Sequence, residues 1–264
     1  MEDYKMKPAL IRFLVMSSLI LFGMGSLIVS LHGGHPQQGS NSHANRTERK
    51  IVPGERTGEY DYDPPVPGSY DLPVLQDAQN GIVVAPDGKP VNLHELLDGR
   101  VAVLSFIYTR CTDPKACLRA SGVLGQLQQF SRTDPSLKDK FQLITLSFDP
   151  GYDTPEVMER YGRVYSQGEG GADWLFLTTR NDNELRPLLE AYGQRVDKRT
   201  KPSALGPYQH TLRVYLIDSK KRVRNIYSYG LLDPRLVMTD VQTLLLEENE
   251  LVKADTSNAK QSGL

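Results

Sequence analysis

The chain has 264 residues, with 31 Lys and Arg against 32 Asp and Glu and a formal net charge of −1. This near-neutral balance argues against a nucleic-acid-binding protein, which usually shows a basic excess or a basic stripe, so no nucleic-acid partner is expected. Hydrophobic residues make up 39% and charged residues 24%, and once the termini are set aside roughly 170–190 residues remain, enough for one domain with its own core.

The N-terminal part of the chain predicts export and membrane attachment. Lys5, Lys7 and Arg12 precede residues 13–31, an uncharged stretch about as long as a membrane span. Positive charge on this side predicts that residues 1–12 are cytoplasmic and that the rest of the chain lies on the exported side, periplasmic or equivalent. A cleaved signal peptide is the alternative, but the stretch is long for one and no clear small-x-small cleavage site follows.

Residues 32–66 predict a flexible linker, since they are rich in Gly, Ser, Asn, Gln, Pro and charge and lack apolar periodicity. We interpret the three histidines of this stretch as solvated linker residues rather than metal ligands; they are His32, His35 and His43. The polar residues 251–264 predict a disordered tail.

Between these termini, residues 67–250 predict one domain of alternating strands and helices. Strands that alternate with helices imply parallel crossovers, and a closing hairpin implies an antiparallel edge, so the expected fold class is α/β, a mixed sheet with helices on both faces. In chain order we expect a hairpin over 81–93, a helical turn at 94–97, a buried strand over 101–108, a helix from Leu118, a strand over 141–148, a helix capped by Asp153, a strand at 174–177, a helix capped by Asn181, a hairpin of strands 210–218 and 223–229, and a helix from Asp233 to about Glu248.

The chain's two cysteines, Cys111 and Cys117, lie where a strand is followed by the start of a helix. Backbone N–H groups and the helix dipole favour thiolates at such a position, which indicates metal or redox chemistry. A continuous helix would turn through roughly 600° between the two residues, so their side chains would diverge. They can converge only if the intervening residues form a loop, which Pro114 favours, and Cys117 lies in the first helical turn.

Two thiolates suit Cu(I), a soft ion, and a histidine could complete the site. Apart from His94, in a surface-like turn, the only histidine of the predicted domain is His210. On chemistry alone, a histidine at a strand start is more often structural, and a cysteine pair in an exported protein is more often a plain disulfide.

Three segments, in order, resemble the SCO/SenC family of copper-delivery proteins. They are Ser-Phe-Ile-Tyr-Thr-Arg-Cys at 105–111, the motif Asp-Pro-Gly-Tyr-Asp-Thr-Pro within 146–156, and the His-Thr strand at 210–218. The resemblance covers roughly residues 67–247. It implies a thioredoxin-like fold with an added hairpin, which binds one copper ion through two cysteines and a histidine and helps to assemble the copper site of cytochrome c oxidase.

By position, the resemblance implies that the metal ligands are Cys111, Cys117 and His210. Asp149 falls where the family places an acid near the metal, which implies a role in orienting a ligand or assisting transfer; the alternative is a turn residue before a helix. The family usually has three residues between its cysteines, whereas this chain has five.

The first functional hypothesis is therefore a membrane-tethered copper chaperone, whose partner is a cytochrome c oxidase subunit or another copper protein. The alternative is a thiol–disulfide oxidoreductase that acts on exported cysteine proteins, with Cys111 or Cys117 as the attacking thiolate. A third reading is a structural disulfide without chemistry, although a bridge closing so short a loop would stabilise the fold by only about 2 kcal/mol.

Overall fold

A computed structural model describes residues 60–261 except 98, 138, 167 and 169. The chain divides into two units, Met1–Glu48 and Arg49–Leu264, and all of the described residues belong to the second. Within the described residues, none of the helices combines the length and the apolar character needed to cross a bilayer. Several predictions lie outside the described residues: the cytoplasmic segment 1–12, the membrane segment 13–31 and the part of the linker at 32–59 with its three histidines.

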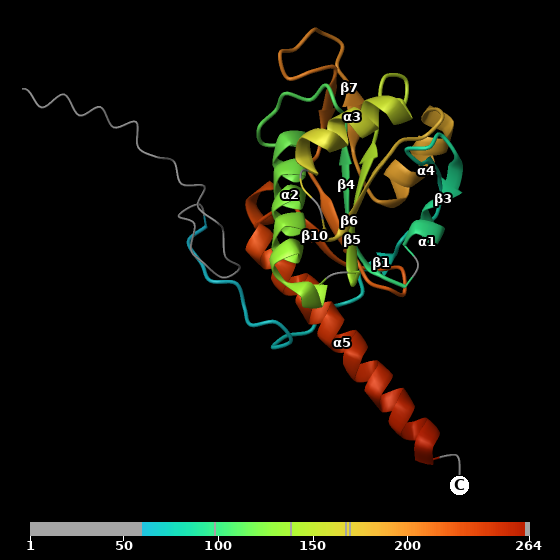
Figure 1. Ribbon diagram of the computed structural model, residues 1–264. Helices are drawn as coiled ribbons and strands as arrows, with labels where there is room; N and C mark the ends of the chain where they lie inside the picture. Colours follow the sequence, from blue (N-terminus) through green and yellow to red (C-terminus); the bar gives the residue numbers. More distant parts are fainter. Residues whose placement is uncertain (1–59, 98, 138, 167, 169, 262–264) are drawn as a thin grey trace, which may run out of the picture. The chain divides into compact units, whose positions relative to one another are not determined.

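A mixed six-stranded sheet forms the centre of the fold, in the strand order β1-β10-β9-β4-β5-β6 (Figure 1). The middle strands β4 (Val101–Ile107) and β5 (Phe141–Ser147) are parallel, and β5 is parallel to β6 (Asp173–Leu177). Every residue of β4 and β5 is buried, as expected for apolar runs covered on both faces. The antiparallel strands follow on the other side of β4: β9 (Val214–Ile217), β10 (Arg222–Tyr227) and β1 (Gln76–Asp77).

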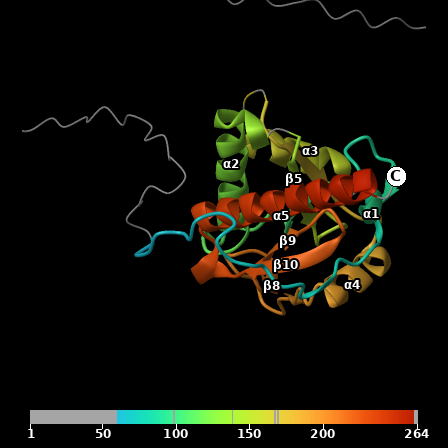
Figure 2. The same ribbon diagram turned by 90° about the horizontal axis from the view of Figure 1, so that it is seen from below.

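Helices cover both faces of this sheet. α2 (Cys117–Thr133) joins β4 to β5, and α3 (Pro155–Tyr165) joins β5 to β6. Because both crossovers step the same way and parallel crossovers are right-handed, α2 and α3 lie on one face, where α5 (Pro234–Gln261) contacts α2 (Figure 2). α4 (Asp182–Ala191) leads the chain back from β6 and lies on the opposite face (Figure 2). The predicted α/β class, a mixed sheet flanked by helices, is confirmed.

The predicted first hairpin and the fourth helix are also confirmed. β2 (Ile82–Val84) pairs with β3 (Pro90–Asn92), and α1 (Leu93–Leu96) follows as the helical turn. The side chain of Asn181 accepts hydrogen bonds from the first backbone N–H groups of α4, as a capping residue does.

The cap of α3 differs from the prediction. The hydroxyl of Thr154 accepts a hydrogen bond from the N–H of Val157, and Pro155 opens the helix. The assignment of Asp153 as the cap is therefore wrong. Its carboxylate is fully buried and turns instead toward the end of β4, where it accepts the backbone N–H of Thr109 at 3.0 Å.

The predicted strand over 210–218 is divided in the structure. Residues Tyr208–His210 form β8, which pairs with β7 (Val196–Lys198) in a hairpin outside the central sheet, and β9 begins only at Val214. Directly after β8, the N–H of Thr211 donates to the carbonyl of Arg195 at 3.1 Å, which extends the pairing of the hairpin. His210 therefore ends the added hairpin instead of starting a central strand.

The final helix is longer than the sequence predicts. α5 continues to Gln261, past the predicted end near Glu248. Residues 249–261 contain neither proline nor glycine, so nothing in that stretch stops the helix. Most of the predicted disordered tail, 251–264, is therefore helical, and residues 262–264 lie outside the described residues.

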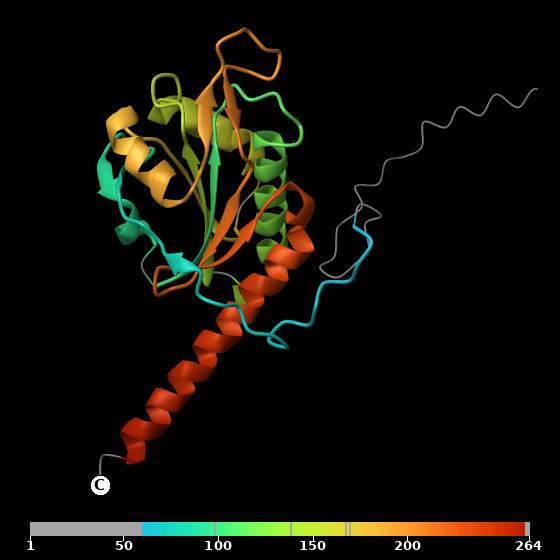
Figure 3. The same ribbon diagram turned by 180° about the vertical axis from the view of Figure 1, so that it is seen from behind.

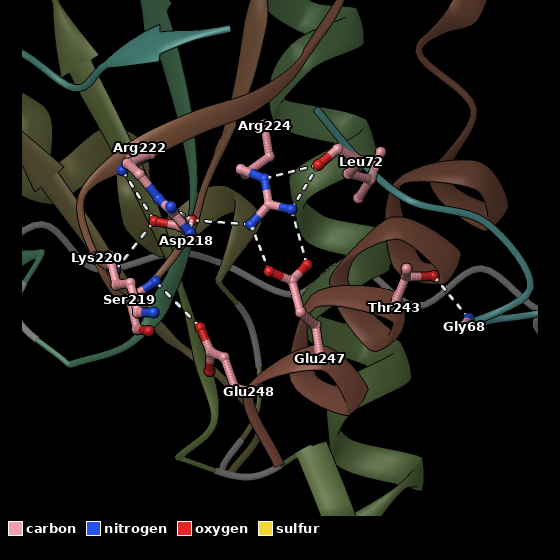
Figure 4. A network of polar contacts seen from close by, with 10 residues as sticks. All are labelled: Gly68, Leu72, Asp218, Ser219, Lys220, Arg222, Arg224, Thr243, Glu247 and Glu248. Carbon is pink, nitrogen blue, oxygen red and sulfur yellow. Dashed lines mark hydrogen bonds and ion pairs between the residues drawn. The ribbon is translucent and has the colours of Figure 1, made fainter. Parts of the chain in front are cut away.

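A buried ion-pair network fastens the antiparallel half of the sheet to α5 (Figure 4). The guanidinium of Arg224, on β10, lies 3.0 Å from Asp218 Oδ2 and 2.7 Å from Glu247 Oε2. Its Nε also donates to the carbonyl of Leu72 at 2.9 Å. One arginine thus joins a strand, the turn that precedes it, the last helix and the segment that leads into β1.

Candidate metal centre

The loop between β4 and α2 carries both cysteines. Two turns shape it: the N–H of Cys111 donates to the carbonyl of Tyr108 at 3.2 Å, and the N–H of Ala116 donates to the carbonyl of Asp113 at 3.2 Å. Cys117 is the first residue of α2. The predicted loop, with the second cysteine in the first helical turn, is confirmed.

The two sulfur atoms and one imidazole nitrogen lie together. Nε2 of His210 is 3.4 Å from Sγ of Cys117 and 3.8 Å from Sγ of Cys111, and the three atoms all lie within 4.8 Å of one another. Both cysteines are buried free thiols, and His210 is half-buried. The five intervening residues thus allow both sulfurs to face one histidine. His94 lies elsewhere, on α1, where its Nε2 is 2.7 Å from the carbonyl oxygen of Ala78.

Aromatic packing holds the imidazole of His210 in place. The ring centroid lies 4.9 Å from that of Phe148 and 5.8 Å, edge to face, from that of Tyr108. Nδ1 of His210 is buried and has no hydrogen-bond partner among the described residues. Histidines that bind metals usually donate this second N–H to an acceptor. Here the two aromatic rings orient the imidazole so that Nε2 points at the sulfurs.

The two thiols have pKa values that are shifted in opposite directions. The hydrogen bond from Cys117 lowers the pKa of the Cys111 thiol to about 4, against the opposing effect of burial, and the hydrogen bond with His210 lowers it further. Burial raises the pKa of the Cys117 thiol well above its usual value, and its hydrogen bond to Cys111 adds to that shift. These opposite shifts favour a pair that keeps one proton at neutral pH, in the hydrogen bond between the two sulfurs.

Asp149, which is buried, links the two segments that supply the sulfurs and the imidazole. Its Oδ2 lies 2.5 Å from Nη2 of Arg110, the residue before Cys111. Its Oδ1 accepts a hydrogen bond at 3.0 Å from the hydroxyl of Tyr208, two residues before His210. Burial, followed by this hydrogen bond, raises the pKa of Tyr208 to about 12, so the hydroxyl keeps its proton at neutral pH. Asp149 braces both segments through their neighbours.

Asp153 holds the base of the cysteine loop. Its carboxylate accepts the backbone N–H of Thr109 at 3.0 Å, the hydroxyl of the same residue, and the hydroxyl of Ser147 at 2.5 Å. Burial raises the pKa of this carboxyl. Asp153 thus joins the ends of the parallel strands β4 and β5. On the β4 side it binds Thr109, two residues before Cys111.

The sequence alone does not single out Arg110, Tyr208 or this role of Asp153. The only signal for Arg110 and Tyr208 is their closeness in the chain to Cys111 and His210. Asp153 carries the signal of a capping residue, because it stands directly before Thr-Pro. Its tertiary partners decide its actual role.

The β7–β8 hairpin lies at the same end of the sheet as the cysteine loop (Figure 3). The hydroxyl of Tyr108 donates to the carbonyl of Leu205 at 2.9 Å, and the hydroxyl of Thr112 donates to that of Ala204 at 2.5 Å. Gly206 has φ +98, and a Cβ there would meet the hydroxyl of Tyr108, so the hairpin requires glycine at this point. A cavity of about 220 Å³ opens between hairpin and loop, and its walls include Cys111 and His210.

Comparison with known proteins gives a consistent result. The family model described as SCO1/SenC matches residues 83–246. The chain is similar to Arabidopsis thaliana ScoI, solved with copper bound, at 18% identity and a TM-score of 0.55, over 64% of this chain and 98% of that one. It is also similar to a SCO1/SenC family lipoprotein from Bacillus anthracis str. Ames, at 24% identity and a TM-score of 0.54, over 64% and 95%.

A third similar structure is BsSco, described as a member of the Sco family of cytochrome c oxidase assembly proteins in which a disulfide switch was identified. The identity is 22% and the TM-score 0.50, over 65% of this chain and 95% of that one. No curated protein sequence matches the chain. At these identities the likeness to solved structures shows a shared fold.

Proposed function

Because the chain belongs to the SCO1/SenC family, we propose that it binds one copper ion and delivers it to the copper site of cytochrome c oxidase. The ligands in this proposal are Sγ of Cys111, Sγ of Cys117 and Nε2 of His210. The observation that carries it is the placement of these three atoms within 4.8 Å of one another. Two soft sulfurs and one imidazole form a donor set that suits Cu(I).

The surroundings of the three groups support a site that both holds and releases its cargo. The acids Asp149 and Asp153 hold the cysteine loop and the hairpin in position without taking up the sulfurs or Nε2. The cavity beside Cys111 and His210 leaves a side from which another protein's ligand can approach. Copper would pass by stepwise ligand exchange, with one donor at a time replaced.

The proposal includes the attachment of the domain to a membrane on its exported side. Residues 13–31 would anchor the chain, and the residues after them would act as a linker to the domain. Such a tether raises the effective concentration of the domain near a membrane-bound oxidase. The similar Bacillus anthracis protein is described as a lipoprotein, which supports attachment in the family without identifying the kind of anchor used here.

The second candidate is a thiol–disulfide oxidoreductase. It is favoured by the hydrogen-bonded thiol pair, in which Cys111 carries the features of an attacking thiolate. The similar structure BsSco is described as having a disulfide switch, which is a property of that protein and is consistent with thiol–disulfide chemistry in this fold. This reaction would not require His210.

The test uses the full chain, reduced and in detergent, titrated with Cu(I) against a competing chelator. We expect stoichiometric binding that weakens strongly in His210→Ala, while His94→Ala, a histidine outside the site, leaves it unchanged. Rapid disulfide exchange without copper binding, unaffected by His210→Ala, would reject the copper proposal and support the oxidoreductase.

A further inference from the structure

Four cations lie on the two segments that carry the ligands of the candidate metal centre. Lys115 lies in the cysteine loop, and Lys198, Arg199 and Lys201 lie at the tip of the β7–β8 hairpin. Arg199 lines the cavity that reaches Cys111. It also lines, with Lys198 and Lys201, an adjoining hollow of about 330 Å³. We call these four residues the basic collar.

Within the described residues, no member of the basic collar forms an ion pair with a carboxylate. Of the acids nearby, Asp149 is paired with Arg110 and Asp197 with Arg195. Asp113 also lines the cavity, and its Oδ1 accepts the backbone N–H of Lys115 at 2.9 Å. The chain as a whole has a net charge of −1, so the collar is a local concentration of positive charge rather than part of a general excess.

Three exposed apolar or aromatic side chains lie on or beside the same segments. The relative exposures are 48% for Tyr152, 41% for Leu205 and 49% for Tyr229. Nζ of Lys115 lies 5.9 Å from the ring centroid of Tyr229, and the guanidinium of Arg110 lies 4.1 Å from that of Tyr152. Aromatic residues together with arginine are typical of protein–protein interfaces. The face around the candidate metal centre therefore has the composition of a docking surface.

We propose that the basic collar docks an acidic protein surface, one whose own metal-binding groups are rimmed by aspartate and glutamate. This deepens the proposed function, on which it rests, by naming the chemistry of the recipient. Cations beside the proposed copper site select a partner by its charge. They also orient the partner, so that its metal ligands face Cys111 and His210. Attraction of this kind speeds association and weakens as salt screens it.

The test combines direct binding with transfer. The probe is a synthetic peptide with one cysteine and one histidine flanked by glutamates, and its counterpart is the same peptide flanked by lysines. Binding of each labelled peptide to the copper-free full chain is followed by fluorescence anisotropy at low and high salt. Transfer of Cu(I) from the loaded full chain to each peptide is followed by stopped-flow kinetics.

The informative variant is Lys198→Glu with Lys201→Glu, since both side chains are exposed. The matched control is Lys140→Glu with Lys220→Glu, which reverses two exposed lysines at the other end of the sheet, where β4 and β5 begin. We expect the collar variant to slow transfer to the acidic peptide about tenfold at low salt. The difference should shrink at high salt, with unchanged copper affinity and an unaffected control.

Three outcomes would overturn the proposal. The first is equal affinity for the acidic and the lysine peptide, and the second is an equal loss of transfer rate in the control variant. The third is equally tight, collar-dependent binding of a single-stranded oligonucleotide, which would indicate a general anion site. Loss of the proposed copper function is a separate result, because the chain would then fail to bind Cu(I) in the chelator titration. Peptide binding to the copper-free chain still decides the docking proposal in that case.

Discussion

Asp149 and Arg110 form an ion pair, with 2.5 Å between Oδ2 and Nη2, next to the first cysteine. The same carboxylate accepts the hydroxyl of Tyr208 on the hairpin that carries His210. This buried carboxylate therefore joins the cysteine loop to the hairpin, in addition to the hydrogen bonds of Tyr108 and Thr112, although it touches neither sulfur nor imidazole in these contacts.

Replacement of Asp149 should weaken copper binding through this positional role. In Asp149→Ala both contacts are lost and the two segments can separate, so we expect Cu(I) affinity to fall roughly 10–100-fold, as for other residues that orient metal ligands. Asp149→Asn, which can still accept from Tyr208, should lose less. Competition with a chelator measures both. Asp173→Ala, which removes an ion pair with Arg100 at the other end of the sheet, is the control, and equal affinities for all variants would contradict the role.

The thiols should titrate far apart. The pKa of Cys111 is lowered to about 4, so this thiol ionises as the pH rises through that value. The pKa of Cys117 is raised, so this thiol keeps its proton at a pH at which an ordinary cysteine would ionise. Ultraviolet absorbance of the copper-free protein should show one thiolate across the neutral range. In Cys117→Ala the hydrogen bond to Cys111 is lost, so the pKa of Cys111 should rise. Two thiols that titrate together would refute this assignment.

Asp153 should contribute to stability as well as to the site. Asp153→Ala leaves the N–H of Thr109 and the hydroxyl of Ser147 without their buried acceptor, and each such loss costs about 1–3 kcal/mol. Denaturant unfolding should show a lower midpoint with an unchanged slope. Thr154→Ala is the informative comparison, because it removes the cap of α3, at about 1 kcal/mol, and an exposed hydrogen bond to Glu156. A larger loss of stability in Thr154→Ala than in Asp153→Ala would contradict the role given to Asp153.

Gly206 should be required for the hairpin to reach the cysteine loop. A Cβ at this position meets the hydroxyl of Tyr108 and lies 3.0 Å from the carbonyl oxygen of Arg110. Gly206→Ala should therefore displace the hairpin and weaken Cu(I) binding. Gly88→Ala is a matched control, because Gly88 also has a positive φ, +78, but nothing lies within 4 Å of its added Cβ. Similar losses in both variants would mean that backbone strain alone is responsible.

Arg224 should contribute to the stability of the fold through its buried ion pairs. Arg224→Ala leaves the buried carboxylate of Asp218 without one of its two arginine partners and Glu247 without its own, and breaking such a buried pair costs about 3 kcal/mol. Thermal unfolding measures the loss. Arg195→Ala, which removes an exposed pair with Asp197, should change stability by less than about 1 kcal/mol; equal effects would show that burial of the network does not matter.

Local sequence patterns predict much of this fold because they depend on neighbours in the chain. The apolar runs of β4 and β5 indicate strands covered on both faces, and Asn181 before an apolar-periodic stretch indicates a helix start. The patterns fail where a distant partner decides. The apolar run after His210 reads as one strand, but pairing with β7 divides it.

The sequence by itself determined that two cysteines lie at a strand-to-helix turn and that they can converge only through a loop, since a continuous helix would turn their side chains apart. With the family motifs it also pointed to His210 and Asp149. Only the tertiary structure decided how these groups meet. Asp149 and Asp153 act across gaps in the chain of dozens of residues, and a buried carboxylate takes whichever donors the fold brings to it, which no local pattern encodes.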